Sequence, residues 1–190
     1  MKEVVLMRII SGLHKGRKLN GDNIEGTRPT MDRVKESLFA MIQEHIKNSV
    51  VLDLFAGSGS LGLESISNGS SFCYFNDYNK KCIKVINDNI KTLHAETSSK
   101  VLSLDYKEAL VYFQKNNIKF NIVFLDPPYK DREINNIIDY LINNELLYDN
   151  GIIVIEVGKD YIEYENLNIY KQRDFCDKQI IILKKWYWKN

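Results

Sequence analysis

From residue 50 onward the sequence alternates between two patterns of hydrophobic and polar positions. Short runs rich in β-branched and aromatic residues, typical of buried strands, occur at residues 50–54, 71–76, 101–104, 120–125 and, after Gly151, 152–157. Longer stretches with one apolar face, typical of helices, lie between them at residues 61–67 and 80–92, around 109–113 and around 134–142. This alternation predicts a mostly parallel sheet that is covered by helices on both faces.

The two ends of the chain depart from this pattern. Residues 167–175 and 179–188 are two β-rich runs around a short turn, which predicts a hairpin that adds an antiparallel edge. Residues 7–12 and 16–19 suggest two short strands, and Thr30 can cap a helix with Val34, Leu38, Met41 and Ile42 on one face. We therefore predict an N-terminal arm over residues 1–47 and an α/β domain over residues 48–190.

Length and charge limit the possible functions. A chain of 190 residues with 44% hydrophobic side chains can form one well-buried core but not two full domains. The 26 basic and 25 acidic residues give a net charge of only +1, so any nucleic-acid surface must be local. The visibly basic region is the arm, with Arg8, Lys15, Arg17, Lys18, Arg28, Arg33 and Lys35.

Several other classes of protein are disfavoured. The three cysteines have no metal-ligand spacing and the three histidines are scattered, so we expect no metal and ordinary thiols in a reducing cytoplasm. No apolar run is long enough to cross a bilayer, and the first six residues are too short and too acidic for a signal peptide. We expect a cytoplasmic protein without a membrane segment.

A glycine-containing loop follows the first strand directly. Its residues are Asp53, Leu54, Phe55, Ala56, Gly57, Ser58 and Gly59. Glycines allow a sharp turn and a close approach to a ligand, and the helix that follows directs free N–H groups toward it. A nucleoside cofactor fits this arrangement, although a tight turn without a ligand would have the same form.

The charge of the loop indicates the type of cofactor. Gly57, Gly59 and Gly62 have the G-x-G-x-x-G spacing of a dinucleotide-binding loop, so the glycines alone do not decide between cofactors. The carboxylate of Asp53 would repel a pyrophosphate but would tolerate a sulfonium with an ammonium group. This charge favours S-adenosylmethionine.

Two further acids follow the next strands. Asp77 lies about twenty residues beyond the loop, where an acid that accepts hydrogen bonds from ribose hydroxyls is expected. Asp105 follows the third strand in the same way and could meet the adenine amino group. A solvated turn at Asp77 and a helix cap at Asp105 are the alternatives.

The sequence Asp126-Pro127-Pro128-Tyr129 ends the fourth strand and carries the strongest chemical signal. Two prolines stiffen the loop and remove backbone donors, so the carboxylate of Asp126 and the carbonyl of Pro127 remain as acceptors. An exocyclic amine is a pair of donors and matches them, and Asp126 could receive the released proton. Tyr129 could stack on a base that has left its helix. A rigid loop with a core tyrosine is the alternative.

The combined motifs resemble a known family. An Asp-Pro-Pro-Tyr sequence after a methyltransferase-type glycine loop is similar to the amino-methyltransferases of DNA, RNA and protein glutamine. The residues at 7–12, 16–17, 28–39 and 52–64 resemble more narrowly the bacterial 16S rRNA guanine-N2 methyltransferases of the RsmD type. The resemblance extends from Met7 to about Leu183.

The resemblance implies a Rossmann-like methyltransferase fold, with a seven-stranded sheet and a small N-terminal β-hairpin and helix. It implies S-adenosylmethionine as cofactor, at the loop, Asp77 and Asp105, and a guanine of small-subunit ribosomal RNA as substrate, within a ribosomal particle. We expect a monomer. The arm residues expected to meet RNA are Arg8, Ser11, Arg17, Arg28 and Arg33.

Three alternatives remain open at this stage. The same loop could methylate adenine N6 or cytosine N4 in DNA or another RNA, although the chain has no large target-recognition insertion. The protein could be a noncatalytic ribosome-assembly factor that kept the fold. A nicotinamide dehydrogenase on a related sheet is disfavoured by the Asp53 carboxylate at the start of the glycine loop.

Overall fold

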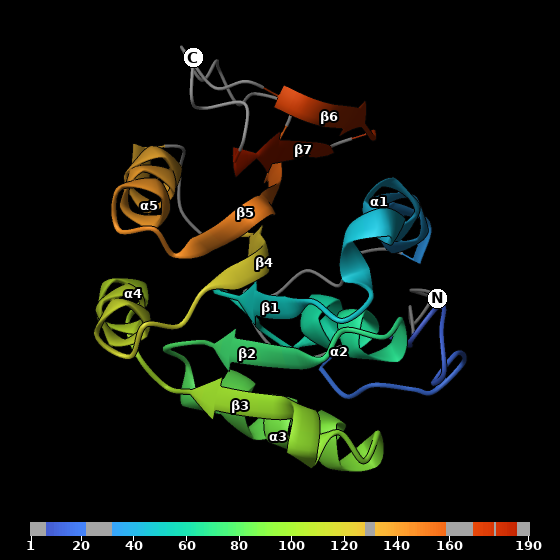
Figure 1. Cartoon of the computed structure of the whole chain (residues 1–190). Helices are drawn as coiled ribbons and strands as arrows, with labels where there is room; N and C mark the ends of the chain where they lie inside the picture. Colours follow the sequence, from blue (N-terminus) through green and yellow to red (C-terminus); the bar gives the residue numbers. More distant parts are fainter. Residues whose placement is uncertain (1–6, 22–31, 128–131, 159–168, 177, 186–190) are drawn as a thin grey trace.

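A seven-stranded sheet forms the centre of the protein, in a computed structural model that describes residues 7–21, 32–127, 132–158, 169–176 and 178–185 (Figure 1). The strand order is β3-β2-β1-β4-β5-β7-β6. The parallel strands are β1 (Val50–Asp53), β2 (Phe72–Asn76), β3 (Ser99–Leu102), β4 (Phe120–Leu125) and β5 (Leu147–Gly158). Strand β7 (Lys178–Lys184) pairs antiparallel with β5 and with β6 (Ile169–Asp174), which confirms the predicted edge hairpin.

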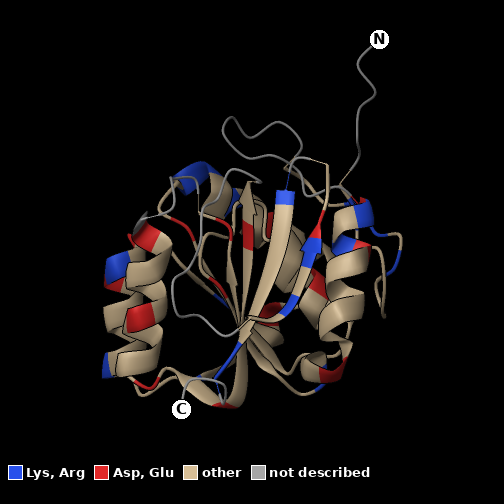
Figure 2. Cartoon of the chain, turned by 90° about the horizontal axis from the view of Figure 1, so that it is seen from above, with Lys and Arg blue, Asp and Glu red and all other residues tan. Residues whose placement is uncertain are grey.

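Helices cover both faces of the sheet, as predicted (Figures 1 and 2). The helices α1 (Asp32–Ile46), α2 (Ser60–Ser67) and α3 (Lys80–Thr92) pack on one face. The helices α4 (Tyr106–Lys115) and α5 (Arg132–Asn143) pack on the other. Figure 2 shows acidic and basic residues mixed over both helical layers.

The order of the strands indicates where a ligand would bind, at the carboxyl ends of the strands. The chain runs from β1 outward to β2 and β3, and then returns to add β4 on the other side of β1. The connections after β1 and β4 therefore leave the sheet toward opposite faces, through α2 and α5. In an open α/β sheet the carboxyl ends of two such strands form the usual binding crevice.

The N-terminal segment shares the core of the α1 face. Met7, Ile9 and Leu19 are buried in one cluster with α1 and with Val51 of β1. On this face the rings of Phe39 and Phe124 lie 6.1 Å apart. The packing joins the described part of the segment to the sheet.

Four local features differ from the sequence-based expectations. The N-terminal runs 7–12 and 16–19 form a single antiparallel bridge, Arg8 to Lys18, because the peptide groups between them bond mainly within their own turn or to α2. Strand β3 begins and ends two residues earlier than predicted, after an unpredicted 3-10 turn, Glu96–Ser98. Strand β5 begins at Leu147, before Gly151. The predicted cap Thr30 lies outside the described residues, so it stays a prediction.

The early start of β5 has a local cause. Its pairing with β4 is irregular between Phe120 and Ile122, where β5 contributes extra residues. Asn150 has a positive φ of 64°, and a Cβ on Gly151 would lie 2.8 Å from the carbonyl oxygen of Tyr148. The Asn-Gly sequence is therefore a bulge within the strand and not the turn that precedes it.

Candidate active site

Four aspartates follow four neighbouring strands at the carboxyl edge of the sheet. Asp53 ends β1, and Asp77, Asp105 and Asp126 lie just beyond β2, β3 and β4. Because these strands are parallel and adjacent, the structure gathers the predicted acids at one edge.

The glycine loop has the conformation that its sequence requires. Gly57 and Gly59 have φ values of 55° and 79°, in the left-handed region that favours glycine. Gly59 also caps α2. Within α2, a Cβ on Gly62 would lie 2.3 Å from the ring of Phe75, so glycine here lets the helix approach the sheet closely. The third glycine of the G-x-G-x-x-G spacing thus has a packing role.

The Asp53 carboxylate is buried beneath this loop. Asp53 is 4% exposed, and one of its carboxylate oxygens accepts a hydrogen bond from the Gly62 N–H at 3.0 Å. Loss of hydration, with a smaller repulsion from Asp77, raises the pKa of Asp53 to about 7. A bound cation would favour the ionised form, so the site suits a positively charged ligand.

Asp77 joins the loop after β2 to the glycine loop. Its two oxygens accept hydrogen bonds from the N–H groups of Gly57, at 2.9 Å, and Asn79, at 2.8 Å. Each carboxylate oxygen can accept a second bond, so a ribose contact remains compatible with this geometry. The Asn76 amide, which sequence analysis did not assign, donates to the carbonyl oxygens of Leu54 and Leu104 and ties three strand ends together.

Asp105 adopts the role that was considered as its alternative. Its side chain caps α4 by accepting a hydrogen bond from the Lys107 N–H at 2.9 Å, and it is exposed. The adenine contact stays a prediction. Nearby, the rings of Phe55 and Tyr106 lie 5.6 Å apart and form an apolar wall beside the loop, while Ala56 and Ser58 are buried within it.

Asp126 lies directly after β4 and remains in contact with solvent. Surrounding protein atoms, and then the negative charge of Glu156, raise the pKa of its carboxyl group, whereas Lys178 lowers it. Contact with water limits this upward shift. Pro127 is half-buried, and Pro128 and Tyr129 lie outside the described residues.

The N-terminal residues expected to meet RNA are held in different ways. Arg8, Arg17 and Arg33 are exposed, and the Nε of Arg8 donates to Asp32 at 2.7 Å. Ser11 is turned toward the protein, because its N–H and hydroxyl groups donate to Glu64 of α2 at 2.8 and 2.9 Å. Arg28 lies outside the described residues.

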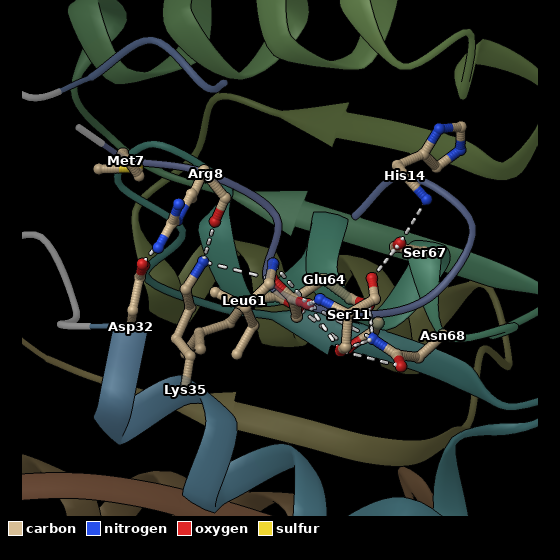
Figure 3. A network of polar contacts seen from close by, with 12 residues as sticks. Met7, Arg8, Ser11, His14, Asp32, Lys35, Leu61, Glu64, Ser67 and Asn68 are labelled. Carbon is tan, nitrogen blue, oxygen red and sulfur yellow. Dashed lines mark hydrogen bonds and ion pairs between the residues drawn. The ribbon is translucent and has the colours of Figure 1, made fainter. Parts of the chain in front are cut away.

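A buried ion pair anchors this segment, and sequence analysis missed it. Lys35 of α1 and Glu64 of α2 are both 0% exposed, and the Lys35 Nζ lies 3.3 Å from a carboxylate oxygen of Glu64. Figure 3 shows the two side chains pointing toward one another. Lys35 also donates to the carbonyl oxygen of Arg8, and Glu64 accepts from the N–H of Ile10. The pair therefore fixes the backbone of the basic segment, and only the pairing of two charged residues on apolar helix faces could have signalled it.

Comparison with known proteins identifies the family. A family model described as "Conserved hypothetical protein 95" matches residues 7–184. Ribosomal RNA small subunit methyltransferase D of Haemophilus influenzae is 38% identical over 88% of this chain and 88% of its own length. The Escherichia coli protein of the same name is 35% identical over 79% of this chain and 74% of its own.

The chain belongs to this family. The predicted resemblance to the RsmD type is thereby confirmed.

Solved structures support the same fold. An Escherichia coli protein provisionally assigned as a methyltransferase superimposes with a TM-score of 0.80 at 29% identity, over 94% of this chain and 97% of that one. An RNA methyltransferase of Salinibacter ruber, solved with S-adenosylhomocysteine, gives a TM-score of 0.63 at 15% identity, over 83% of this chain and 93% of that one, and shows likeness of fold. The Rossmann-like methyltransferase fold is confirmed.

Among the described residues, no group of three or more His, Cys, Asp and Glu side chains is placed to hold a metal ion. In the same part of the chain, no helix combines the length and the apolar character that a membrane span needs.

Proposed function

We propose that the protein transfers a methyl group from S-adenosylmethionine to the exocyclic N2 of a guanine in small-subunit ribosomal RNA. Relatives named as small-subunit rRNA methyltransferases support methylation of rRNA with this methyl donor. The observation that carries the proposal is the position of Asp126 and Pro127 at the end of β4, beside the glycine loop of β1.

The residues at the carboxyl edge fit the cofactor. When bound, the cofactor supplies an electrophilic methyl group on a positively charged sulfur. The buried Asp53 carboxylate suits a cationic ligand, and the loop of Phe55, Ala56, Gly57, Ser58 and Gly59 would let the ligand approach the backbone. Asp77 would accept hydrogen bonds from the ribose hydroxyls, and Asp105 would contact the adenine amino group.

The loop after β4 would hold the reacting amine. The Asp126 carboxylate and the Pro127 carbonyl would accept its two hydrogens and orient the nitrogen lone pair. Because the pKa of Asp126 is raised, its carboxylate is a stronger base than an ordinary aspartate and could take the proton that the amine loses. Pro128 would stiffen the loop, and Tyr129 would stack on the base.

The basic segment would bind the RNA. Arg8, Arg17 and Arg33 are exposed for phosphate contacts, and the proposal extends to Arg28. Ser11 would help to hold this segment in position for the RNA, through its hydrogen bonds to Glu64. We propose further that residues 1–47 form this RNA-binding arm and residues 48–190 the catalytic domain, and that a monomer acts on a ribosomal particle in the cytoplasm.

Methyl transfer to small subunits from cells that lack the enzyme tests the proposal. Labelled S-adenosylmethionine, nuclease digestion and mass spectrometry should reveal N2-methylguanosine, and Asp126→Ala should yield none. Label in N6-methyladenosine or N4-methylcytidine would overturn the choice of base. Absence of cofactor binding in calorimetry would overturn an enzymatic role and favour a noncatalytic assembly factor.

A further inference from the structure

A buried carboxylate that the proposed reaction does not use lies next to Asp126. The Glu156 side chain, near the end of β5, is 4% exposed. One of its oxygens accepts a hydrogen bond from the Lys178 ammonium of β7. Its second oxygen, Oε2, is buried and has no hydrogen-bond partner among the residues that the structure describes. A buried oxygen without a donor is costly and therefore requires an explanation.

The register of the strands directs this carboxylate toward the site. Leu125 of β4 pairs with Ile155 of β5, so Asp126, directly after β4, and Glu156, on β5, follow a matched pair of residues. Side chains at matching positions of adjacent strands lie on the same face of a sheet. The electrostatic effect of Glu156 on Asp126 agrees with this proximity.

An apolar residue would be the simplest choice at this position. Val154 and Ile152, two and four positions earlier on the same face, are buried in the core beneath α1. Glu156 instead brings a charge that repels Asp126 and requires Lys178 as a partner. Replacement of buried ion pairs by apolar residues is often neutral or stabilising, so stability alone does not explain the pair.

We propose that Glu156 determines specificity for the base, by accepting a hydrogen bond from N1–H of the target guanine through Oε2. The proposal rests on the proposed function, in which Asp126 and Pro127 hold the neighbouring N2 amine. Lys178 would fix the other oxygen of Glu156 and keep the carboxylate oriented.

The chemistry of the bases supports this assignment. Guanine carries a donor, N1–H, next to its exocyclic amine. Adenine has the acceptor N1 next to N6, and cytosine has the acceptor N3 next to N4. A carboxylate beside Asp126 would bind the guanine edge and repel the other two, which Asp126 and Pro127 alone could not distinguish.

A substrate analogue that lacks this donor, together with the neighbouring 6-oxo group, provides the test. Once the methylated guanine has been located, small subunits can be reconstituted with 16S rRNA that carries guanine or 2-aminopurine at that position. Both bases have the 2-amino group, but 2-aminopurine has an acceptor at N1. The wild-type enzyme should methylate the guanine particles at least about 10-fold faster, measured as kcat/KM. Equal use of both bases would overturn the proposal.

The variant Glu156→Gln separates a specific contact from a structural one. An amide can accept from N1–H or donate to a bare N1, so the preference for guanine should fall to within about threefold. If both substrates lose activity equally and the preference remains, Glu156 has only a structural role and the inference fails. Should the variant not fold, as judged by circular dichroism, equal use of both bases by the wild-type enzyme would still overturn the proposal.

The control is Glu44→Gln, which removes another glutamate paired with a lysine. Glu44 is exposed near the end of α1 and accepts hydrogen bonds from Lys171 and Tyr170. This variant should keep the full preference for guanine. Failure of the proposed function would be a separate result, because the wild-type enzyme would then leave the N2 of the guanine particles unlabelled.

Discussion

The two faces of the sheet are both deeply buried, but by different chemistry. Beneath α4 and α5 the contacts are mainly apolar and aromatic, with the rings of Phe113 and Phe120 5.0 Å apart and perpendicular. On the face beneath α1, α2 and α3, Asp53 and Glu156 lie buried among apolar side chains, and the helices add Lys35, Glu64 and Asn89. Asn76, at the end of β2, is the exception on the aromatic side among the described residues.

This difference separates stability from function. Burial of apolar side chains stabilises a fold without fixing the position of any particular group. Buried polar groups are costly unless their hydrogen-bond partners are in position, so they fix those partners. The polar groups of the α1 face hold the N-terminal segment through Lys35 and Glu64, and they contribute Asp53 and Glu156 to the carboxyl edge. We expect substitutions on the two faces to separate accordingly.

The largest effect is expected for Asp126→Ala, at the carboxyl edge. Loss of the carboxylate removes an acceptor for the amine and a base for its proton, so methyl transfer should fall by about 10³-fold or more. Affinity for S-adenosylmethionine should stay within about threefold, because Asp126 is assigned to the amine. Transfer assays and calorimetry measure the two quantities, and a large loss of cofactor affinity with normal turnover would contradict the assignment.

On the aromatic face, Phe113→Ala should act on stability alone. Removing the fully buried ring leaves a cavity beside Phe120 and Tyr74 and should cost about 3–5 kcal/mol of the free energy of unfolding. Urea denaturation measures this cost. The folded fraction should bind S-adenosylmethionine with unchanged affinity, and a specific loss of binding would break the distinction between the faces.

Asp53→Asn, on the polar face, should have the opposite effects, with higher stability and weaker cofactor binding. The pKa of Asp53 is raised from 3.8 to about 7, so the folded state holds its proton more tightly than the unfolded state. Wild-type stability therefore falls as pH rises from about 4 to about 7, through the ionisation of this buried group.

The variant lacks this charge and should be more stable than the wild type above pH 7, by on the order of 1–3 kcal/mol. Cofactor affinity should fall, because the carboxylate that favours a cation is gone. Urea denaturation at pH 5 and pH 8 checks the first expectation, and calorimetry checks the second. An identical pH dependence in both proteins would show that Asp53 does not ionise in this window.

The smallest effect is expected at the outer surface of the N-terminal segment and α1. Changing both Arg17 and Arg33 to Ala should weaken RNA binding and lower the slope of its salt dependence by about 1–2. Changing Lys115 and Lys119, near the end of α4, removes the same charge on the opposite side and should leave the slope unchanged. Titrations at several salt concentrations decide, and equal effects of the two double variants would remove the segment from the RNA interface.

Sequence patterns predicted the strands and helices well because the elements carry strong periodicity. The five apolar runs became β1 to β5, and the glycine loop and acids lie at their carboxyl ends. The predicted bounds of the strands were wrong where a short sequence fits two structures. Asn150-Gly151 is such a place, because its sequence is typical of a turn but forms a bulge. The two predicted N-terminal strands pair only through the Arg8–Lys18 bridge, because α2 supplies other partners for part of their backbone.

Parts of the candidate site could not be found from the sequence. Asn76, Glu64 and Glu156 act through partners 22 to 54 positions away along the chain. No spacing rule connects such residues, since only the folded chain brings them together. Asp105 shows the converse, because its position suggested a ligand contact and the structure also gives it a role as a helix cap.

One asparagine links the two ends of the proposed site. The Asn89 side chain, fully buried on α3, accepts from the Asn20 N–H and donates to the carbonyl oxygens of Asn20 and Ser58. It therefore connects the N-terminal segment to the glycine loop. Any ligand that steadies one of these would, through Asn89, help to steady the other, and reciprocity requires the benefit to be equal in both directions. S-adenosylmethionine and RNA should then bind cooperatively, so that each raises the affinity of the protein for the other.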